Sequence, residues 1–273
     1  MLLSVITINY NNGSELRKTI TSVFKQSFQD FEYIIVDGAS SDDSVEVIKT
    51  LIKENETHYC KWISEPDNGI YNAMNKGIQL SRGEYLLFLN SGDYLVADDV
   101  LERVFKYECH ADLLCARCRV SETGRIVWTS ALVPSVITLR WLYFRGLMHQ
   151  STFIRRDLFS RVGMYDESFR WLADVQFWYK AIIYNDATSQ PINVITTDYN
   201  HEGTSSTTKN NVDFSSENHW PDSQPVLRHI MPDYKIWKRE KRIVREYGWI
   251  DKHRFLKWLL RGLKKIIVRQ SGK

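Results

Sequence analysis

Residues 31–44 read Phe-Glu-Tyr-Ile-Ile-Val-Asp-Gly-Ala-Ser-Ser-Asp-Asp-Ser, and this stretch decides the fold. A short run rich in β-branched and aromatic residues ends at Asp37, where Gly, Ser and Asp follow. Apolar residues then recur at helical spacing over 44–54. The stretch therefore predicts a strand over 31–37, a polar turn, and a helix.

The same alternation continues on both sides of this stretch. Short β-branched or aromatic runs predict strands over 2–9, 59–64 and 85–90, and apolar residues at helical spacing predict helices over 15–26 and 70–79. Repeated strand–helix–strand units form a mainly parallel sheet with helices on both faces. The sequence thus predicts an α/β fold, in which ligands bind beyond the carboxyl ends of the strands.

Polar residues gather at each of these carboxyl ends. The segments are Asn9-Tyr10-Asn11-Asn12-Gly13, residues 37–44, Glu65-Pro66-Asp67-Asn68-Gly69 and Asn90-Ser91-Gly92-Asp93. Turn and helix-capping residues are expected there in any case, and for one segment alone capping explains them as well as function does. Because all four segments converge on one sheet edge, they favour a binding site.

The residue types at this edge leave open a nucleotide that is bound together with a metal ion without the usual nucleotide-binding motifs. Neither a Gly-x-Gly-x-x-Gly nor a Gly-x-x-x-x-Gly-Lys motif occurs, which disfavours a dinucleotide-binding fold and a P-loop nucleotidase. Asp37 can accept hydrogen bonds from a base or ribose. Asp93 can hold a hard cation that bridges two phosphates.

The ordered series of motifs resembles the family 2 glycosyltransferases, which have the GT-A fold and include enzymes of bacterial polysaccharide assembly. The matching segments are residues 4–11, Thr21-Ser22-Val23 with Gln26-Ser27, residues 34–42, residues 64–77, residues 83–93, His149-Gln150-Ser151 and Leu172-Ala173-Asp174. Each motif is weak alone, but their order and spacing over residues 3–205 are specific. The resemblance implies a GT-A catalytic domain over 1–220, with a donor-binding half over about 1–95 and an acceptor half over about 96–220.

The resemblance also implies which residues bind a nucleotide-sugar donor. Asp37 would recognise the uracil or other base, and Asp93 would bind Mn²⁺ or Mg²⁺ through the family's Asp-x-Asp motif. That motif keeps only one carboxylate in Asn90-Ser91-Gly92-Asp93. The residues that would line the donor cleft are Asn9, Asn11, Asp37, Asp67, Gly69, Asn75, Lys76 and Ser91.

Asp174 matches the position of the catalytic base in inverting members of the family. An acceptor hydroxyl must lose its proton as it attacks the anomeric carbon, so a carboxylate within hydrogen-bond reach is needed. Taken alone, Asp174 reads as a helix cap or an ion-pair partner for a helix over 175–183. Its place in the ordered motifs favours the base.

Three further residues are candidate donor or acceptor contacts. His149 and Gln150 lie in a matching motif, although a lone His beside apolar residues is as readily a structural group. A strand is predicted over 192–197, and His201 follows it in a Gly- and Ser-containing segment that resembles the family's loop over the donor. An ordinary surface loop explains that segment equally well.

The charge of the chain is divided between two regions. The net charge is only +3, but residues 226–273 contain 15 Lys and Arg against 4 Asp and Glu, a local charge of +11 that leaves −8 elsewhere. Over 251–273 the spacing predicts a helix with an apolar stripe that contains Trp and Leu on one side and basic residues on the other. This pattern is typical of a helix that lies in a membrane interface. Packing of this helical tail, 221–273, on its own domain or on another subunit is the alternative. No nucleic-acid-binding motif is recognisable, which disfavours a nucleic-acid partner.

The remaining sequence signals bear on the compartment. Cys115 and Cys118 form a Cys-x-x-Cys, but on a strand predicted over 112–120 they would face opposite sides, so buried thiols in a reducing cytosol are favoured over a zinc site. The N-terminus reads as a strand rather than a signal peptide, and no uncharged run is long enough to span a bilayer.

Together these features predict an inverting, metal-dependent glycosyltransferase. It would move a sugar, with UDP as the expected nucleotide, to a saccharide or lipid-linked acceptor in cell-surface polysaccharide biosynthesis. The location would be cytoplasmic, peripheral on the inner face of the membrane, and homo-oligomer formation is left open. The alternatives are a catalytically silent nucleotide-sugar-binding scaffold and, less favoured, a sugar nucleotidyltransferase.

Overall fold

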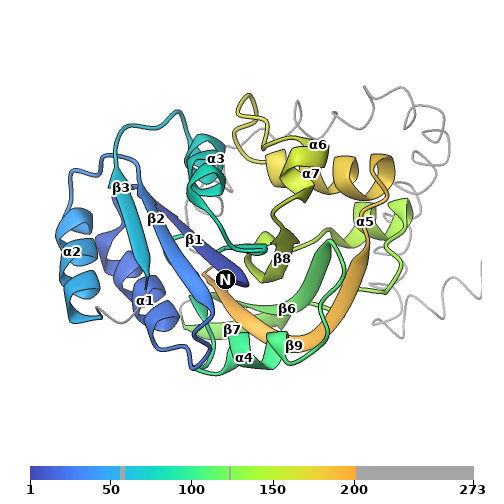
Figure 1. Ribbon diagram of the computed structural model, residues 1–273, viewed down its shortest axis with the longest axis horizontal. Coiled ribbons are helices and arrows are strands. Elements are labelled where there is room, and N and C mark those ends of the chain that lie inside the picture. The colour runs from blue at the N-terminus through green and yellow to red at the C-terminus, as the bar shows by residue number, and fades with distance from the viewer. Residues whose placement is uncertain (56–58, 123, 201–273) are drawn as a thin grey trace, which may run out of the picture. The chain divides into compact units, whose positions relative to one another are not determined.

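The first half of the fold is a parallel sheet, as predicted. The computed structural model describes residues 1–55, 59–122 and 124–200. Its first four strands are β1 (Leu3–Asn9), β2 (Phe31–Asp37), β3 (Cys60–Ser64) and β4 (Tyr85–Phe88). They lie in the order β3-β2-β1-β4, and all three neighbouring pairs are parallel. Their carboxyl ends therefore meet at one edge of the sheet (Figure 1).

Helices cover both faces of this sheet. The helices α1 (Gly13–Phe24), α2 (Ser44–Glu54) and α4 (Val100–Phe105) share one hydrophobic core with alternate strand residues such as Val5 and Tyr33. The helix α3 (Ile70–Leu80) lies on the other face of the sheet (Figure 1). It packs so closely that a Cβ at Gly77 would stand 2.4 Å from the Ile6 Cγ2 atom. The predicted helices and strands of the first half are thus confirmed, with small differences at their ends.

The second half of the sheet is mixed. Its strands are β5 (Tyr94–Leu95), β6 (Leu113–Glu122), β7 (Arg125–Thr129), β8 (Thr152–Arg155) and β9 (Ser189–Asn200). The order continues from β4 as β8-β6-β9-β5, and β7 pairs with β6. Only the β6–β9 pair is parallel here. The strands predicted over 112–120 and 192–197 appear as β6 and β9.

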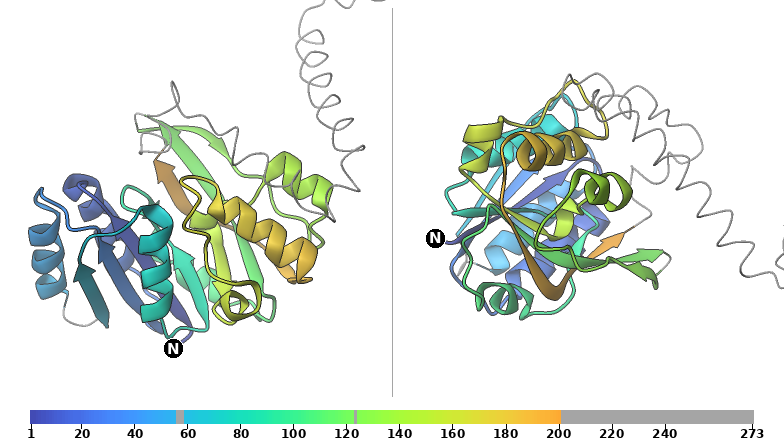
Figure 2. Two further views of the ribbon diagram at one scale, coloured as in Figure 1. Left: turned by 90° about the horizontal axis from the view of Figure 1, so that it is seen from above. Right: turned by 90° about the vertical axis from the view of Figure 1, so that its right-hand side faces the viewer.

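An aromatic cluster joins two of the remaining helices, α6 and α7, to α3. The remaining helices are α5 (Leu139–Arg145), the 3₁₀ helix η1 (His149–Ser151), α6 (Leu158–Val162), α7 (Ala173–Tyr179) and the π-helical turn η2 (Lys180–Tyr184). The Tyr165 ring lies 5.6 Å from Tyr71 of α3 and 5.3 Å from Phe177 of α7 between ring centroids. Such contacts between rings stabilise beyond the area they bury. They hold the start of α7 beside α3 (Figure 2).

The cysteines of β6 are buried, unpaired thiols. Neither Cys115 nor Cys118 forms a disulfide. Burial raises the pKa of each thiol to about 12, so both remain protonated at neutral pH and are poor zinc ligands. Over the described ranges no group of three or more His, Cys, Asp or Glu side chains lies close enough together to hold a metal ion by itself. Within those ranges, too, every helix is too short or too polar to cross a membrane.

Candidate active site

One row of side chains crosses the carboxyl ends of β1, β2 and β3. The strand registers pair Asn9 with Asp37 and Asp37 with Ser64, so the three side chains share one face of the sheet. Asn9 Nδ2 donates to Asp37 Oδ1 over 2.8 Å, and Ser64 Oγ donates to Asp37 Oδ2 over 2.7 Å. The sheet itself thus brings these residues together.

The Asp37 carboxylate is held by four hydrogen bonds from the protein. Besides Asn9 and Ser64, Ser40 donates twice, from its hydroxyl over 2.6 Å and from its backbone N–H over 3.0 Å. Burial alone would raise the pKa of Asp37, but the hydrogen bonds outweigh it and the pKa lies below its ordinary value of 3.8. Two donors reach each oxygen, which uses the acceptor capacity of a carboxylate. Asp37 therefore holds the carboxyl ends of β1, β2 and β3 together.

The loops after β1 and β2 are tied together in the same way. Asn11 has a left-handed backbone with φ of 49°, and its Oδ1 accepts from the Ser41 N–H over 2.8 Å. The Asn11 N–H donates to Ser40 Oγ over 2.8 Å. Tyr10, which precedes Asn11, is 67% exposed, so its ring can stack on a planar ligand.

The loop after β3 approaches the loop after β2 at Gly38. A Cβ there would lie 2.5 Å from Asp67 Oδ2 and 3.2 Å from Tyr10 Cδ2, so the absence of a side chain allows the close approach. Asp67 Oδ1 accepts from the Gly69 N–H over 2.9 Å, and Gly69 has φ of 113°, which favours glycine. The predicted donor residues Asn9, Asn11, Asp37, Asp67 and Gly69 thus lie on neighbouring loops.

Asn75 and Lys76 point to other partners. Asn75 is buried, and its amide donates to the Tyr165 carbonyl over 2.9 Å and to Glu167 Oε1 over 2.8 Å. Lys76 pairs with Glu65 and donates to the Pro66 carbonyl, each over 2.8 Å. These bonds position the loops on either side of α3, and donor contact by either residue stays a prediction.

The turn after β4 carries the predicted metal ligand. Thr19 Oγ1 accepts from the Gly92 N–H over 3.0 Å and donates to the Asp93 carbonyl over 2.7 Å, so α1 fixes the turn. Asn12 Nδ2 reaches Ser91 Oγ over 3.3 Å, which joins the turn to the loop after β1. The Asp93 side chain is buried near Cys118, where its charge adds to burial in raising the pKa of that thiol.

The predicted base sits in a chain of hydrogen bonds. Asp174 Oδ2 lies 3.2 Å from His149 Nδ1, and Asp174 Oδ1 accepts from the Tyr71 hydroxyl over 3.0 Å. The other His149 nitrogen, Nε2, lies 3.4 Å from Asn90 Nδ2. With the Asn90 amide as donor, Nε2 is the acceptor and Nδ1–H donates to Asp174. The chain thus links the turn that carries Asp93 to the predicted base, and the contacts of the Asp174 carboxylate differ from those of a helix cap.

The last two candidates are placed differently. Gln150 is buried, and its Oε1 atom has no hydrogen-bond partner within the described structure. Its backbone carbonyl accepts from Thr197 Oγ1 over 2.6 Å, which fixes η1 to β9. His201 lies outside the described residues.

Sequence reasoning missed three members of the site. Tyr71 and Asn90 belong to motifs already recognised. Nothing in those motifs indicates that Tyr71 bonds to Asp174, or that Asn90 is connected to Asp174 through His149. The sequence could have indicated Tyr10. An aromatic residue that is flanked by two Asn, between the end of a strand and the start of a helix, is not expected to pack in the hydrophobic core.

The residues at the turn after β4 suit a hard cation that takes other ligands from its substrate. Such cations prefer oxygen ligands and often bind through one or two carboxylates together with phosphates. Asp93 supplies one carboxylate, and the Oδ1 atom of Asn90 on the same turn is buried without a hydrogen-bond partner. The set therefore fits a metal ion that arrives with a nucleoside diphosphate.

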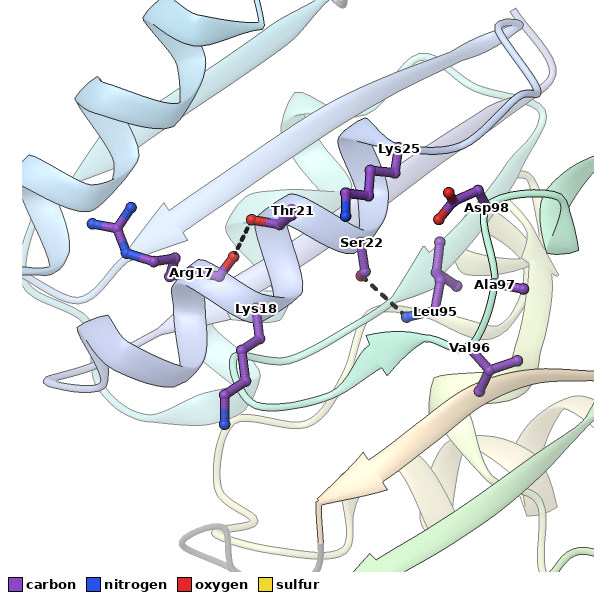
Figure 3. A pocket seen from close by; sticks show the side chains of 9 residues that line it. All are labelled: Arg17, Lys18, Thr21, Ser22, Lys25, Leu95, Val96, Ala97 and Asp98. Atoms are coloured by element: carbon purple, nitrogen blue, oxygen red, sulfur yellow. Dashed lines mark hydrogen bonds between the residues drawn. The ribbon is translucent and has the colours of Figure 1, made fainter. Parts of the chain in front are cut away.

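A separate hollow on the outer side of α1 holds none of the predicted site residues. It has a volume of about 330 Å³ and lies between α1 and the segment after β5, and its lining includes Arg17, Lys25 and Asp98. Figure 3 shows the Arg17 and Lys18 side chains pointing in different directions, and Ser22 bonded to the Leu95 N–H. This hollow is therefore distinct from the edge that carries Asp37 and Asp93.

The fold and these motifs identify the class of protein. The glycosyl transferase family 2 model matches residues 4–170. The chain belongs to this family, and it is a glycosyltransferase with the GT-A fold. The nucleotidyltransferase alternative thereby loses its support.

Known relatives agree with this assignment. The chain is 29% identical over 211 residues to a PGL/p-HBAD biosynthesis glycosyltransferase of Mycobacterium bovis, covering 74% of this chain and 78% of that protein. It is 33% identical over 129 residues to the poly(ribitol-phosphate) beta-N-acetylglucosaminyltransferase TarP of Staphylococcus aureus, covering 46% of this chain and 39% of TarP.

Solved structures share the fold. S. aureus TarS in complex with UDP-GlcNAc superposes with a TM-score of 0.63 at 21% identity, over 79% of this chain and 63% of that one. A Pyrobaculum calidifontis mannosyltransferase in complex with GDP-Man and Mn²⁺ gives 0.55 at 14% identity, over 71% of this chain and 55% of that one.

Proposed function

We propose that the protein transfers a sugar from a UDP-sugar, with inversion and with a divalent metal, to a saccharide or lipid-linked acceptor in glycoconjugate or polysaccharide biosynthesis. The observation that carries this proposal is the hydrogen-bond chain Asn90–His149–Asp174. It connects the turn that would hold metal and diphosphate to a carboxylate that would accept a proton.

The donor would bind across the loops after β1, β2 and β3. Tyr10 would stack on the base, while Asn11 and the loop held by Asp37 would shape the cleft around it. Asp67 and Gly69 would border the ribose and phosphates. The UDP-GlcNAc complex of TarS, which shares the fold, supports a uridine nucleotide.

The transfer step would be a single displacement. The acceptor oxygen forms a bond to the anomeric carbon as the bond from that carbon to the diphosphate oxygen breaks. Asp174 takes the proton of the acceptor hydroxyl, using a lone pair that Tyr71 and His149 leave open. A divalent ion held by Asp93 would neutralise the charge that gathers on the departing diphosphate.

His149 would act as a positioning residue for this base. Its Nδ1–H holds one carboxylate oxygen and its Nε2 is held by Asn90, so the ring cannot rotate without losing both bonds. A base whose orientation is set before the reaction loses less entropy on reaching the transition state. Donor or acceptor contact by Gln150 and His201 remains a separate part of the proposal.

The cellular setting is inferred from the sequence of the basic tail, since the helix predicted over 221–273 lies outside the described residues. Its +11 charge and its apolar stripe support attachment to the inner face of the cytoplasmic membrane, since each basic residue near an anionic leaflet contributes about 1 kcal/mol. Homo-oligomer formation through the same stripe is the alternative.

A donor panel tests the proposed function. UDP-, GDP- and dTDP-sugars would be incubated with the full chain, with and without manganese, and release of the nucleotide and sugar transfer would be measured. We expect turnover with a UDP-sugar that stops when EDTA removes the metal. Equal turnover in EDTA would contradict metal dependence, and binding without turnover for every donor would favour a silent scaffold.

A further inference from the structure

Exposed apolar side chains gather on one segment after β6. Five large hydrophobic residues there are between 46% and 76% exposed, and they make up half of all such residues in the described ranges. The five are Ile126, Val127, Trp128, Leu132 and Val136. We call residues 125–145, which run from β7 through α5, the β7–α5 surface.

The strand β7 shows that this exposure departs from an ordinary surface strand. A strand with one buried face alternates apolar and polar residues, whereas Ile126, Val127 and Trp128 are consecutive and all exposed. In the described ranges β7 pairs only with β6. Figure 2 shows the β6–β7 hairpin, in green, projecting from the rest of the described sheet. β7 thus exposes apolar side chains on both of its faces, and exposed apolar surface of this kind is typical of a docking site.

The charges around this surface show what would dock. Residues 123–156 contain five Arg and no Asp or Glu, although the chain before the tail carries −8. Arg125, Arg140 and Arg145 lie within the β7–α5 surface and are exposed. Trp and aliphatic side chains mixed with cations are typical of groups that enter the headgroup region of a bilayer. A second copy fits less well, because a two-fold contact would place these arginines against one another.

The β7–α5 surface adjoins the segment that carries His149. A cavity of about 300 Å³ is lined by Trp128 of β7, Trp141 and Arg145 of α5, and Met148 and Ser151 of η1 and its cap. The residue between Met148 and Gln150 is His149, which contacts Asp174. The cavity therefore connects the β7–α5 surface to the segment that carries His149.

We propose that the β7–α5 surface docks on an anionic lipid bilayer, with Ile126, Val127 and Trp128 entering the headgroup region and the three arginines meeting lipid phosphates. A benefit of docking to turnover would rest on the proposed function, whereas the docking itself is measured without turnover. This surface belongs to the catalytic domain and is additional to the basic tail.

A fluorescent reporter tests docking at this surface in particular. An environment-sensitive dye would be attached at Val127→Cys in the full chain, with Cys60 and Cys109 changed to Ser. The matched control carries the dye at Tyr59→Cys, which is 45% exposed and precedes β3 at the far end of the sheet order. With vesicles of equal parts phosphatidylcholine and phosphatidylglycerol, we expect a blue shift at position 127 and none at 59.

Three outcomes would overturn the proposal. They are no shift at position 127, equal shifts at both positions, and a shift without vesicles that grows with protein concentration, which would indicate self-association. A shift as large with pure phosphatidylcholine would overturn the role of the arginines.

A second experiment measures the strength of docking. Replacing Ile126, Val127 and Trp128 by Ser should weaken vesicle binding at least about tenfold, since the variant loses the apolar surface that leaves water when the hairpin enters the headgroup region. The control is Arg17→Gln with Lys25→Gln on α1, which removes two exposed charges beside the hollow of Figure 3. UDP binding should be unchanged in both variants. Equal vesicle binding by the triple variant and the wild type would exclude docking at this surface.

Discussion

The edge around Asp37, which we propose binds the donor (the donor edge), and the contacts around Asp174, the proposed base (the catalytic corner), are built in different ways. At the donor edge, Asn9, Asp37 and Ser64 stand at paired positions of neighbouring parallel strands, so backbone register alone brings them together. At the catalytic corner, Tyr71 and Asp174 are 103 residues apart and meet through packing of α3 against α7. A site made by register should lose stability when altered, whereas a site made by side-chain contacts between helices should lose turnover first.

The largest effect is expected at the base. Asp174→Asn keeps the shape of the side chain but cannot take the acceptor proton, so transfer should fall by about 10²–10⁴-fold. Transfer of a labelled sugar measures the loss, and calorimetry should show unchanged UDP affinity. Near-normal transfer by this variant would refute the role of Asp174.

The next effect is expected for the group that orients the base. His149→Ala removes the donor to Asp174 Oδ2, and kcat should fall about tenfold or more while the donor KM stays unchanged. His149→Asn places an amide N–H near the former Nδ1 position and should restore part of kcat. If His149→Ala raised the donor KM without lowering kcat, His149 would be a donor contact instead.

At the donor edge we expect a loss of stability. Asp37→Ala leaves the buried Asn9 amide and the more exposed Ser40 and Ser64 hydroxyls without their acceptor, so the free energy of unfolding should fall by about 1–3 kcal/mol, and UDP affinity should fall with it. Thermal and denaturant unfolding measure the change, with the exposed Asp98→Ala as control. Unchanged stability together with lost UDP affinity would instead support direct base recognition by Asp37.

The same group sets a pH dependence of stability. Because the pKa of Asp37 is lowered in the folded state, its charged form stabilises the fold at neutral pH, and this contribution is lost as the pH falls below the ordinary value of 3.8. Asp37→Asn should therefore lose less stability than the wild type on acidification through that range.

The smallest effect is expected when the hydroxyl of Tyr71 is removed, and the neighbouring Tyr165 provides the control. Tyr71→Phe removes a hydroxyl bonded to Asp174 and to the Trp171 carbonyl, whereas the Tyr165 hydroxyl is buried without a partner within the described structure. Tyr71→Phe should lower kcat severalfold and stability by about 1 kcal/mol, and Tyr165→Phe should change neither appreciably. Equal kinetics for the two variants would remove Tyr71 from the catalytic corner.

The sequence by itself determined the first half of the fold and which polar residues meet at the edge that we propose binds the donor. Strands over 31–37 and 85–90 are legible because β-branched runs alternate with helical spacing, and parallel topology then places their carboxyl ends together. The prediction of Asp174 also came from sequence, through its place in an ordered series of motifs.

Only the tertiary structure decided how those residues are used. Base contact by Asp37 stays a prediction, and the structure adds that its oxygens are held by Asn9, Ser40 and Ser64, a number of partners that no local pattern reveals. The pairing of His149 with Asp174, and the exposure of consecutive apolar residues on β7, depend on which surfaces distant segments cover. Local patterns encode elements because periodicity is local, whereas side-chain contacts and burial depend on the packing of the whole domain.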